Sequence, residues 1–95
     1  MNIRDEFEQM LTNAIDETGV VLLQSPSELA DYMAERADKL AGFKYDAGFS
    51  RAISLERNSI AIAAGLSLTD GSRMADQRLI GMISGALRIA ALALP

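Results

Sequence analysis

The sequence contains no cysteine, no histidine and no tryptophan in its 95 residues. Without thiols or imidazoles it can form no disulfide, no zinc site of the usual kind and no Ser-His or Cys-His nucleophile pair, and it has no histidine pH switch. Most catalytic chemistry is excluded by these absences. Carboxylates are the plentiful reactive groups that remain.

The carboxylates follow the spacing of solvated helix faces rather than that of a catalytic pair. The two main groups are Asp5, Glu6 and Glu8, and Glu28, Asp31, Glu35 and Asp38. No Glu-x-x-His element is present to hold a metal inside a helical bundle. Neither glycine-rich phosphate motif, G-x-x-x-x-G-K-[ST] or a strand followed by G-x-G-x-x-G, is present. We therefore expect no catalytic residue, no cofactor and no metal, and we predict that the protein is not an enzyme.

Basic residues are also few, at 9 against 13 acidic ones, which gives a net charge of −4 and a pI of about 4.6. Affinity for nucleic acid comes mainly from lysine and arginine at phosphates. A helix-turn-helix built from the last two helices would need Arg51, Arg57, Arg73 and Arg78 on one face, and the last helix is too apolar to read base edges. We expect no nucleic-acid partner.

The charge is divided unevenly along the chain. Residues 1–41 hold nine acidic and three basic side chains, for −6, and residues 42–95 hold four and six, for +2. These halves could pair within one chain or between copies, or they could be ordinary interspersed surface charge. The sequence leaves the three interpretations open.

Apolar spacing predicts a helix over 3–18 and a second over 26–41, because apolar residues recur every three or four positions in both. Gly19 is expected to end the first. The run Ser25-Pro26-Ser27-Glu28 predicts the start of the second, with Ser25 as N-cap, Pro26 where no N–H is needed and Glu28 bonding back to the cap. Gly42 is expected to end it.

A third helix is predicted over 47–64, with Asp46 as its N-cap and Gly65 as its end. The polar cluster 69–72 predicts a turn and an N-cap before a last helix that runs from about Arg73 to the C-terminus. Asp76 falls in the first turns of that helix. Glu56 lies close to the apolar stripe of the third helix, and a carboxylate there requires a partner if it is buried.

Two connecting segments are ambiguous. Val20 to Leu23 has the composition of a strand, but no second strand is available within the chain, so we prefer an extended or loosely helical connector packed on the core. A strand would require edge-to-edge pairing of two copies. In the segment 42–49, Phe43, Tyr45 and Phe49 either close the core, the commoner outcome, or anchor a partner.

The last helix is apolar on nearly every face from residue 79 onward, with Arg88 as its only charge. Such a helix must be enclosed by the other helices, by another copy or by lipid. Sixteen residues around an arginine are too few to span a bilayer, so we expect no membrane partner. Gly81 and Gly85 form a G-x-x-x-G pair that permits close packing, for which a neighbouring helix of the same chain is the first choice and another copy the second.

These patterns predict one all-α domain over residues 1–95, a small bundle of three to four helices whose last helix is central or lies in a subunit interface. The predicted contact surface is Leu79, Ile80, Gly81, Ile83, Gly85, Leu87 and Leu92. The first twenty residues are acidic and lack the apolar run of a secretory signal, which favours the cytoplasm.

Three stretches resemble the small helical proteins encoded by tailed bacteriophages and prophages. They are Ser25-Pro26-Ser27-Glu28-Leu29-Ala30, Ala34-Glu35-Arg36-Ala37 and the segment from Gly81 to Leu92. The resemblance implies a phage product, located either in the particle or in the host cytoplasm.

The function predicted from the sequence is non-enzymatic: a self-associating module for protein interactions, as a phage-related structural or assembly component. The alternative is an acidic regulator or inhibitor that occupies a basic surface of a target protein. Its binding face would be the first two helices, through Asp5, Glu6, Glu8, Asp31, Glu35 and Asp38.

Overall fold

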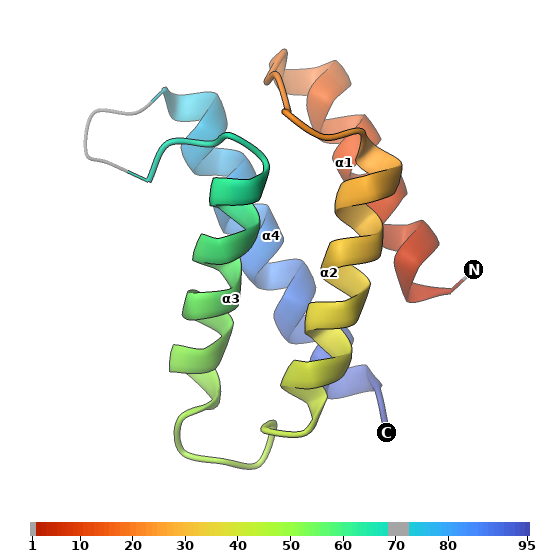
Figure 1. The fold of residues 1–95 in the computed structure, drawn as a ribbon, viewed down its shortest axis with the longest axis vertical. Helices are drawn as coiled ribbons and strands as arrows, with labels where there is room; N and C mark the ends of the chain where they lie inside the picture. The colour runs from red at the N-terminus through yellow and green to blue at the C-terminus, as the bar shows by residue number, and fades with distance from the viewer. Residues whose placement is uncertain (1, 69–72) are drawn as a thin grey trace.

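Four α-helices follow one another in the computed structural model, which describes residues 2–68 and 73–95 (Figure 1). They are α1 (Ile3–Thr18), α2 (Pro26–Ala41), α3 (Phe49–Ala63) and α4 (Met74–Ala93). Neither described range contains a β-strand. The predicted all-α bundle is confirmed.

The helices α2 and α4 form the centre of the bundle, with α1 on one side and α3 on the other. Helix α3 packs on both central helices, whereas α1 packs mainly on α2 and touches α4 only lightly. Within the described residues, α1 and α3 do not meet. The molecule is therefore flat, with principal extents of 35 × 32 × 17 Å, and α4 runs behind α2 and α3 in Figure 1.

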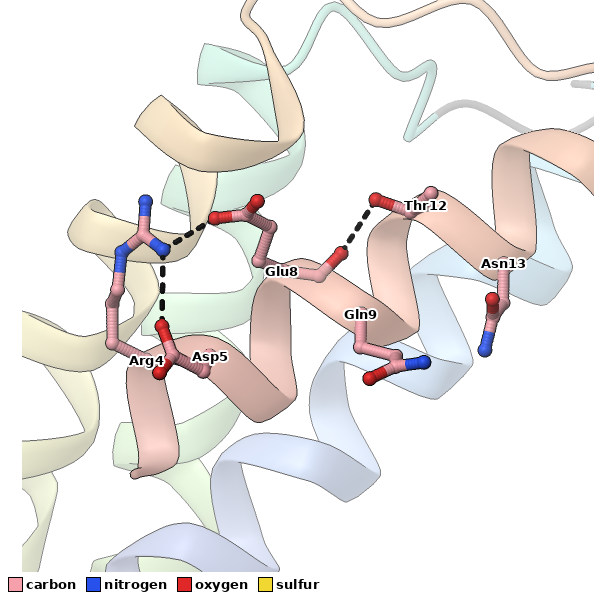
Figure 2. Close-up of a pocket in the computed structure, with 6 residues that line it drawn as sticks. All are labelled: Arg4, Asp5, Glu8, Gln9, Thr12 and Asn13. Atoms are coloured by element: carbon pink, nitrogen blue, oxygen red, sulfur yellow. Dashed lines mark hydrogen bonds and ion pairs between the residues drawn. The ribbon is translucent and has the colours of Figure 1, made fainter. Parts of the chain in front are cut away.

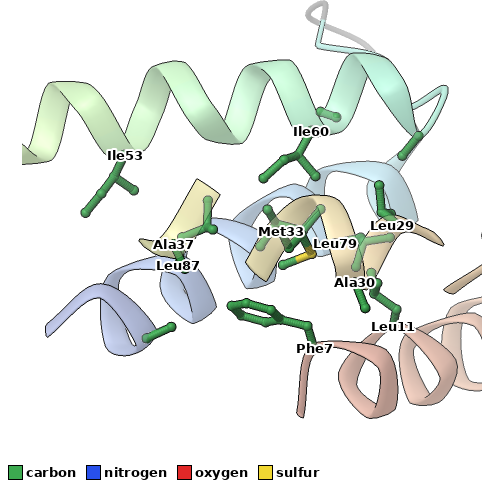
Figure 3. Packing of buried hydrophobic residues seen from close by; sticks show 14 of the residues in the cluster. Phe7, Leu11, Leu29, Ala30, Met33, Ala37, Ile53, Ile60, Leu79 and Leu87 are labelled. Carbon is green, nitrogen blue, oxygen red and sulfur yellow. The ribbon is translucent and has the colours of Figure 1, made fainter. Parts of the chain in front are cut away.

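Side chains from all four helices meet in one hydrophobic core between them (Figure 3). The largest fully buried ones are Leu11, Leu29, Met33, Leu40, Ile53, Ile60, Leu79, Ile83 and Leu87. Full burial of one such side chain stabilises the fold by about 1.5–3 kcal/mol. Because α4 supplies three of them, its core-facing stripe is enclosed by the other helices of the same chain.

The bounds of α1 and α2 match the sequence prediction because each helix carries clear capping residues. Asn2 caps α1, and Gly19 ends it in the left-handed conformation at φ 70°. The Ser25 hydroxyl accepts a hydrogen bond from the Glu28 amide at 3.1 Å and donates one to the Glu28 carboxylate at 2.9 Å. Gly42 follows α2 but keeps a right-handed helical conformation, so it does not act as a left-handed stop.

The start of α3 differs from the prediction, since Asp46 is not its N-cap. Helix α3 begins at Phe49, and Gly48 occupies the cap position without a side-chain hydrogen bond. The Asp46 amide donates to the Phe43 carbonyl at 2.9 Å, and the Asp46 carbonyl accepts from the Phe49 amide at 3.1 Å. These consecutive turns satisfy the backbone locally and delay the helix by two residues. The end of α3 agrees better, with Gly65 at φ 78°.

The turn and N-cap predicted in 69–72 lie outside the described residues. Helix α4 itself begins at Met74, with Arg73 in the cap position. This start is one residue from the predicted one.

The segment Val20 to Leu23 is an irregular connector, neither helical nor paired as a strand in the described structure. Val20 is buried and Leu22 is half-buried against the core. The Leu23 amide donates to the Ala64 carbonyl at 3.0 Å, and the Gln24 side-chain amide donates to the Ala63 carbonyl at 3.2 Å. The connector thus fastens the start of α2 to the end of α3.

Candidate functional site

No group of three or more acidic side chains in residues 2–68 and 73–95 lies close enough together to hold a metal ion. None of the four described helices combines the length and hydropathy needed to cross a bilayer. The candidate sites in this part of the chain are surfaces and shallow hollows.

An open hollow of about 430 Å³ lies along one exposed side of α1 (Figure 2). Every lining residue comes from this helix: Arg4, Asp5, Glu8, Gln9, Thr12 and Asn13. A pocket that binds a small molecule needs walls that converge on it. With one helix as its lining, the hollow is polar helix surface.

Arg4 at the edge of this hollow joins the beginnings of α1 and α2. Its Nε donates to Asp31 Oδ1 at 2.7 Å, and its Nη1 donates to Asp5 at 3.2 Å and to Glu8. Its Nη2 donates to the carbonyl of Ser27 at 3.1 Å. The hydrogen bond to Asp31, more than those to Glu8 and Asp5, raises the pKa of the Arg4 guanidinium above its ordinary value.

The inhibitor hypothesis depends on an acidic face formed by α1 and α2. The contacts of Arg4 reduce the number of carboxylates on this face that are free to bind a target. Three of its six predicted residues, Asp5, Glu8 and Asp31, share this one arginine. The carboxylates that a basic target could use are therefore mainly Glu6, Glu35 and Asp38.

Glu56 on α3 forms ion pairs with two cations of α2, although its Oε2 and Arg36 Nε make no hydrogen bond. Its carboxylate lies 3.3 Å from Arg36 Nε and 3.9 Å from Lys39 Nζ, both on α2. The Arg36 guanidinium also lies over the Tyr32 ring, 4.9 Å from its centre. The Glu56 side chain is 15% exposed, so this cluster joins α2 to α3 and leaves little of the carboxylate for a ligand.

Asp76 is a buried carboxylate that sequence reasoning placed only as a residue of the first turns of α4. It is 6% exposed, and its Oδ2 accepts a hydrogen bond from the Ser67 amide at 3.4 Å. An acid in the first turn of a helix also interacts favourably with the helix dipole. That preference is the signal in the sequence, but it does not distinguish a buried acid from an exposed one.

The aromatic residues after α2 divide between the two roles considered for them. Phe49 is buried and closes the core, whereas Phe43 is 45% exposed and Tyr45 is 92% exposed. Between them, Lys44 donates a hydrogen bond to the Leu94 carbonyl just after α4. Core closure is thus correct for Phe49 alone.

The contact surface predicted from the sequence is divided by the structure. Leu79, Ile83 and Leu87 are 0% exposed and lie inside the monomer core, so they do not form a surface. Ile80 is half-buried, while Gly81, Gly85 and Leu92 are exposed. The two groups alternate because residues two positions apart lie on nearly opposite sides of a helix.

The outward side of α4, which we call the open face, presents Met74, Gly81, Gly85, Ile89 and Leu92, and the exposed arginines Arg78 and Arg88 lie on the same side. Ile89 is 72% exposed, Met74 75% and Leu92 54%. A Cβ added at Gly81 or Gly85 would meet no atom within 4 Å. The expectation that this glycine pair seats a neighbouring helix of the same chain is therefore wrong, and packing against another molecule remains as a prediction.

The open face continues into an apolar hollow between α1 and α4, of about 210 Å³. Its lining is Ile3, Glu6, Phe7, Met10, Ala86, Ile89, Ala90 and Ala93. We call it the α1–α4 groove. It is open because the two helices touch only lightly along this side. The groove and the open face share Ile89, so the two are contiguous.

Comparison of the chain with protein-family models, with curated proteins and with solved structures finds no match.

Proposed function

We propose that this chain is a non-enzymatic, self-associating module for protein interactions, and that the open face of α4 is its contact surface. The observation that carries the proposal is the exposure of Ile89 and Leu92 beside two glycines that have open space around them. A contiguous exposed apolar surface on a small protein marks an interaction site.

The glycines add to this argument through their energetic cost. Each glycine inside a helix destabilises it by about 0.5–1 kcal/mol relative to alanine. Neither Gly81 nor Gly85 makes room for a neighbour inside the monomer. Their small size is useful where another helix approaches the backbone of α4 closely.

The biological setting that we propose is that of a phage-related structural or assembly component, as the resemblance to small helical phage and prophage proteins implies. Such components act by binding copies of themselves or neighbouring proteins. This role needs no cofactor, no metal and no nucleic acid.

The test is Gly85→Leu, which fills the centre of the open face. Because a Cβ at Gly85 meets no atom within 4 Å in the monomer, the fold is expected to be retained, while a partner can no longer approach α4 closely. Self-association, followed by light scattering over a hundredfold concentration range, is expected to weaken by about tenfold or more, as for loss of a central interface contact.

Thr12→Leu is the matched control, because Thr12 is exposed on the α1 side that lines the polar hollow and not the groove. This variant is expected to associate like the unaltered chain. If Gly85→Leu left the association unchanged, or if the unaltered chain were a monomer throughout, the proposed function would be wrong.

A further inference from the structure

The two sides of the surface formed by α1 and α4 carry opposite charge. Glu6 and Glu17 are exposed on α1, and Arg78 is exposed on α4. Glu17 and Arg78 line one small hollow together with Met74. Among the described residues, none of these three charges belongs to an ion pair. Such a surface attracts a partner on which the two signs occur in the reverse order.

A second copy of the chain presents the two signs of charge in the reverse order if it is rotated by a suitable two-fold axis. Helices α1 and α4 run antiparallel, because the start of α1 lies beside the end of α4 at Ile3 and Ala93, and the end of α1 lies beside Met74. A symmetric face-to-face dimer has its two-fold axis in the plane of contact. The two limiting directions of this axis are along these helices and across them.

An axis across the helices places α4 on α4, and charge opposes this arrangement. An antiparallel pair centred between Gly81 and Gly85 has its midpoint at position 83. Arg78 and Arg88 lie equally far from this midpoint, so Arg78 would face Arg88 of the other copy. A parallel α4 pair would place Arg78 against its own counterpart. The acidic α1 helices would also face each other in the antiparallel case, and like charges brought together in an interface cost binding energy.

An axis along the helices places α1 of each copy across α4 of the other. This rotation leaves the height of each residue along the axis unchanged. Glu17 and Arg78 lie at the same height in one copy, so Glu17 of the second copy comes to lie opposite Arg78 of the first. We propose that the chain forms this two-fold dimer, with α1 of one copy packed antiparallel on the open face of the other. The inference rests on the proposed function and specifies its partner as a second copy of the chain.

The size of the surface fits such a contact. Two helices of about 10 Å diameter and about 24 Å length present about 500 Å² per copy, or about 1,000 Å² in total. This is near the lower limit for a specific interface, so the dimer is expected to depend on concentration. Ile89 and Leu92 supply its apolar centre, and the glycines allow α1 of the second copy to approach.

The experiment compares Glu17→Arg and Arg78→Glu, each alone and mixed in equal amounts. Alone, each variant places like charges at both symmetric contacts, and its dimer is expected to weaken by about tenfold relative to the unaltered chain. In the mixture, both introduced charges meet an opposite charge, so a mixed dimer is expected to form as tightly as the original. Sedimentation velocity measures all four samples, and thermal unfolding confirms that each variant is folded.

Glu35→Arg is the control for the change of charge, because Glu35 is exposed on α2, which does not line the groove. Its dimerisation is expected to stay within about twofold of the original, since exposed charges away from the contact act weakly. Raised salt is expected to weaken the original dimer and to strengthen the two single variants.

Two results would overturn this dimer arrangement but leave the proposed function standing. One is a dimer strengthened by Arg78→Glu, because the introduced carboxylate would then face Arg88 in an α4-on-α4 pair. The other is a dimer that Gly85→Leu breaks but the charge reversals leave unchanged. A chain that is monomeric at all concentrations would overturn both the inference and the proposed function.

Discussion

The two sides of α4 both carry apolar residues but have opposite positions in the structure. Leu79, Ile83 and Leu87 form one side and are completely buried, whereas Gly81, Gly85 and Leu92 lie on the other and are exposed. Size alone does not explain the difference, because Leu92 is as large as Leu79. The buried side is an unbroken row of large aliphatic side chains between the other helices, whereas the outer side also holds the two glycines and the exposed arginines Arg78 and Arg88. In such a helix, an unbroken row of large side chains marks the core side better than the hydropathy of any one position does.

The largest effect is expected when the buried side is shortened. Leu79→Ala removes a fully buried side chain and is expected to lower the free energy of unfolding by about 2–5 kcal/mol. Leu92→Ala on the exposed side is the matched substitution, with an expected change of at most about 0.5 kcal/mol. Urea unfolding at low protein concentration measures both, and similar losses would show that the two sides are not distinguished as described.

A smaller loss of unfolding free energy is expected from Gly65→Ala. This substitution tests whether the fold requires a glycine at position 65. Gly65 has φ 78°, and an added Cβ would lie 2.5 Å from Leu23 Cγ. Left-handed backbone costs about 1–2 kcal/mol for a residue with a Cβ. The unfolding free energy is therefore expected to fall by at least about 1 kcal/mol in the same urea experiment. An unchanged value would mean that the connector adjusts freely at Leu23.

The smallest effect has the opposite sign. Gly81→Ala is expected to raise the unfolding free energy by about 0.5–1 kcal/mol, because the new Cβ meets nothing and alanine favours the helix. The measurement is made at a concentration where the chain is monomeric, so that association does not contribute. A loss of stability would contradict the open position of this glycine.

Much of the fold could be predicted from the sequence where local chemistry determines it. Ser25 and Gly19 fix the ends of α1 and α2 by capping and backbone conformation, which depend only on nearby residues. Asp46 misled the prediction because an acid before a helix can equally lie in a turn. The position of Glu56 beside the core correctly indicated a partner, although sequence spacing could not identify Arg36.

The candidate site was less predictable. Helical spacing places Leu79, Ile83 and Leu87 opposite Gly81 and Gly85, but the sequence prediction grouped all five as one surface. The exposed arginines Arg78 and Arg88, each seven residues from one of the glycines, are the sparse signal that marked the outer side. Which side is buried depends on the space between the other helices. The burial of Asp76 depends in the same way on the Ser67 amide, which comes from a different segment.

The absence of contact between α1 and α3 has a consequence for the internal motions of the molecule. Within the described residues, the helix–helix contacts of α1 and of α3 are all with α2 and α4, so α1 can separate without breaking a contact with α3. Local unfolding of this kind proceeds in cooperative units with less free energy than global unfolding. Helix α1, held mainly by α2 and by the contacts of Arg4, is such a unit. Amide protons of α1 are therefore expected to exchange with solvent before those of the α2–α4 pair.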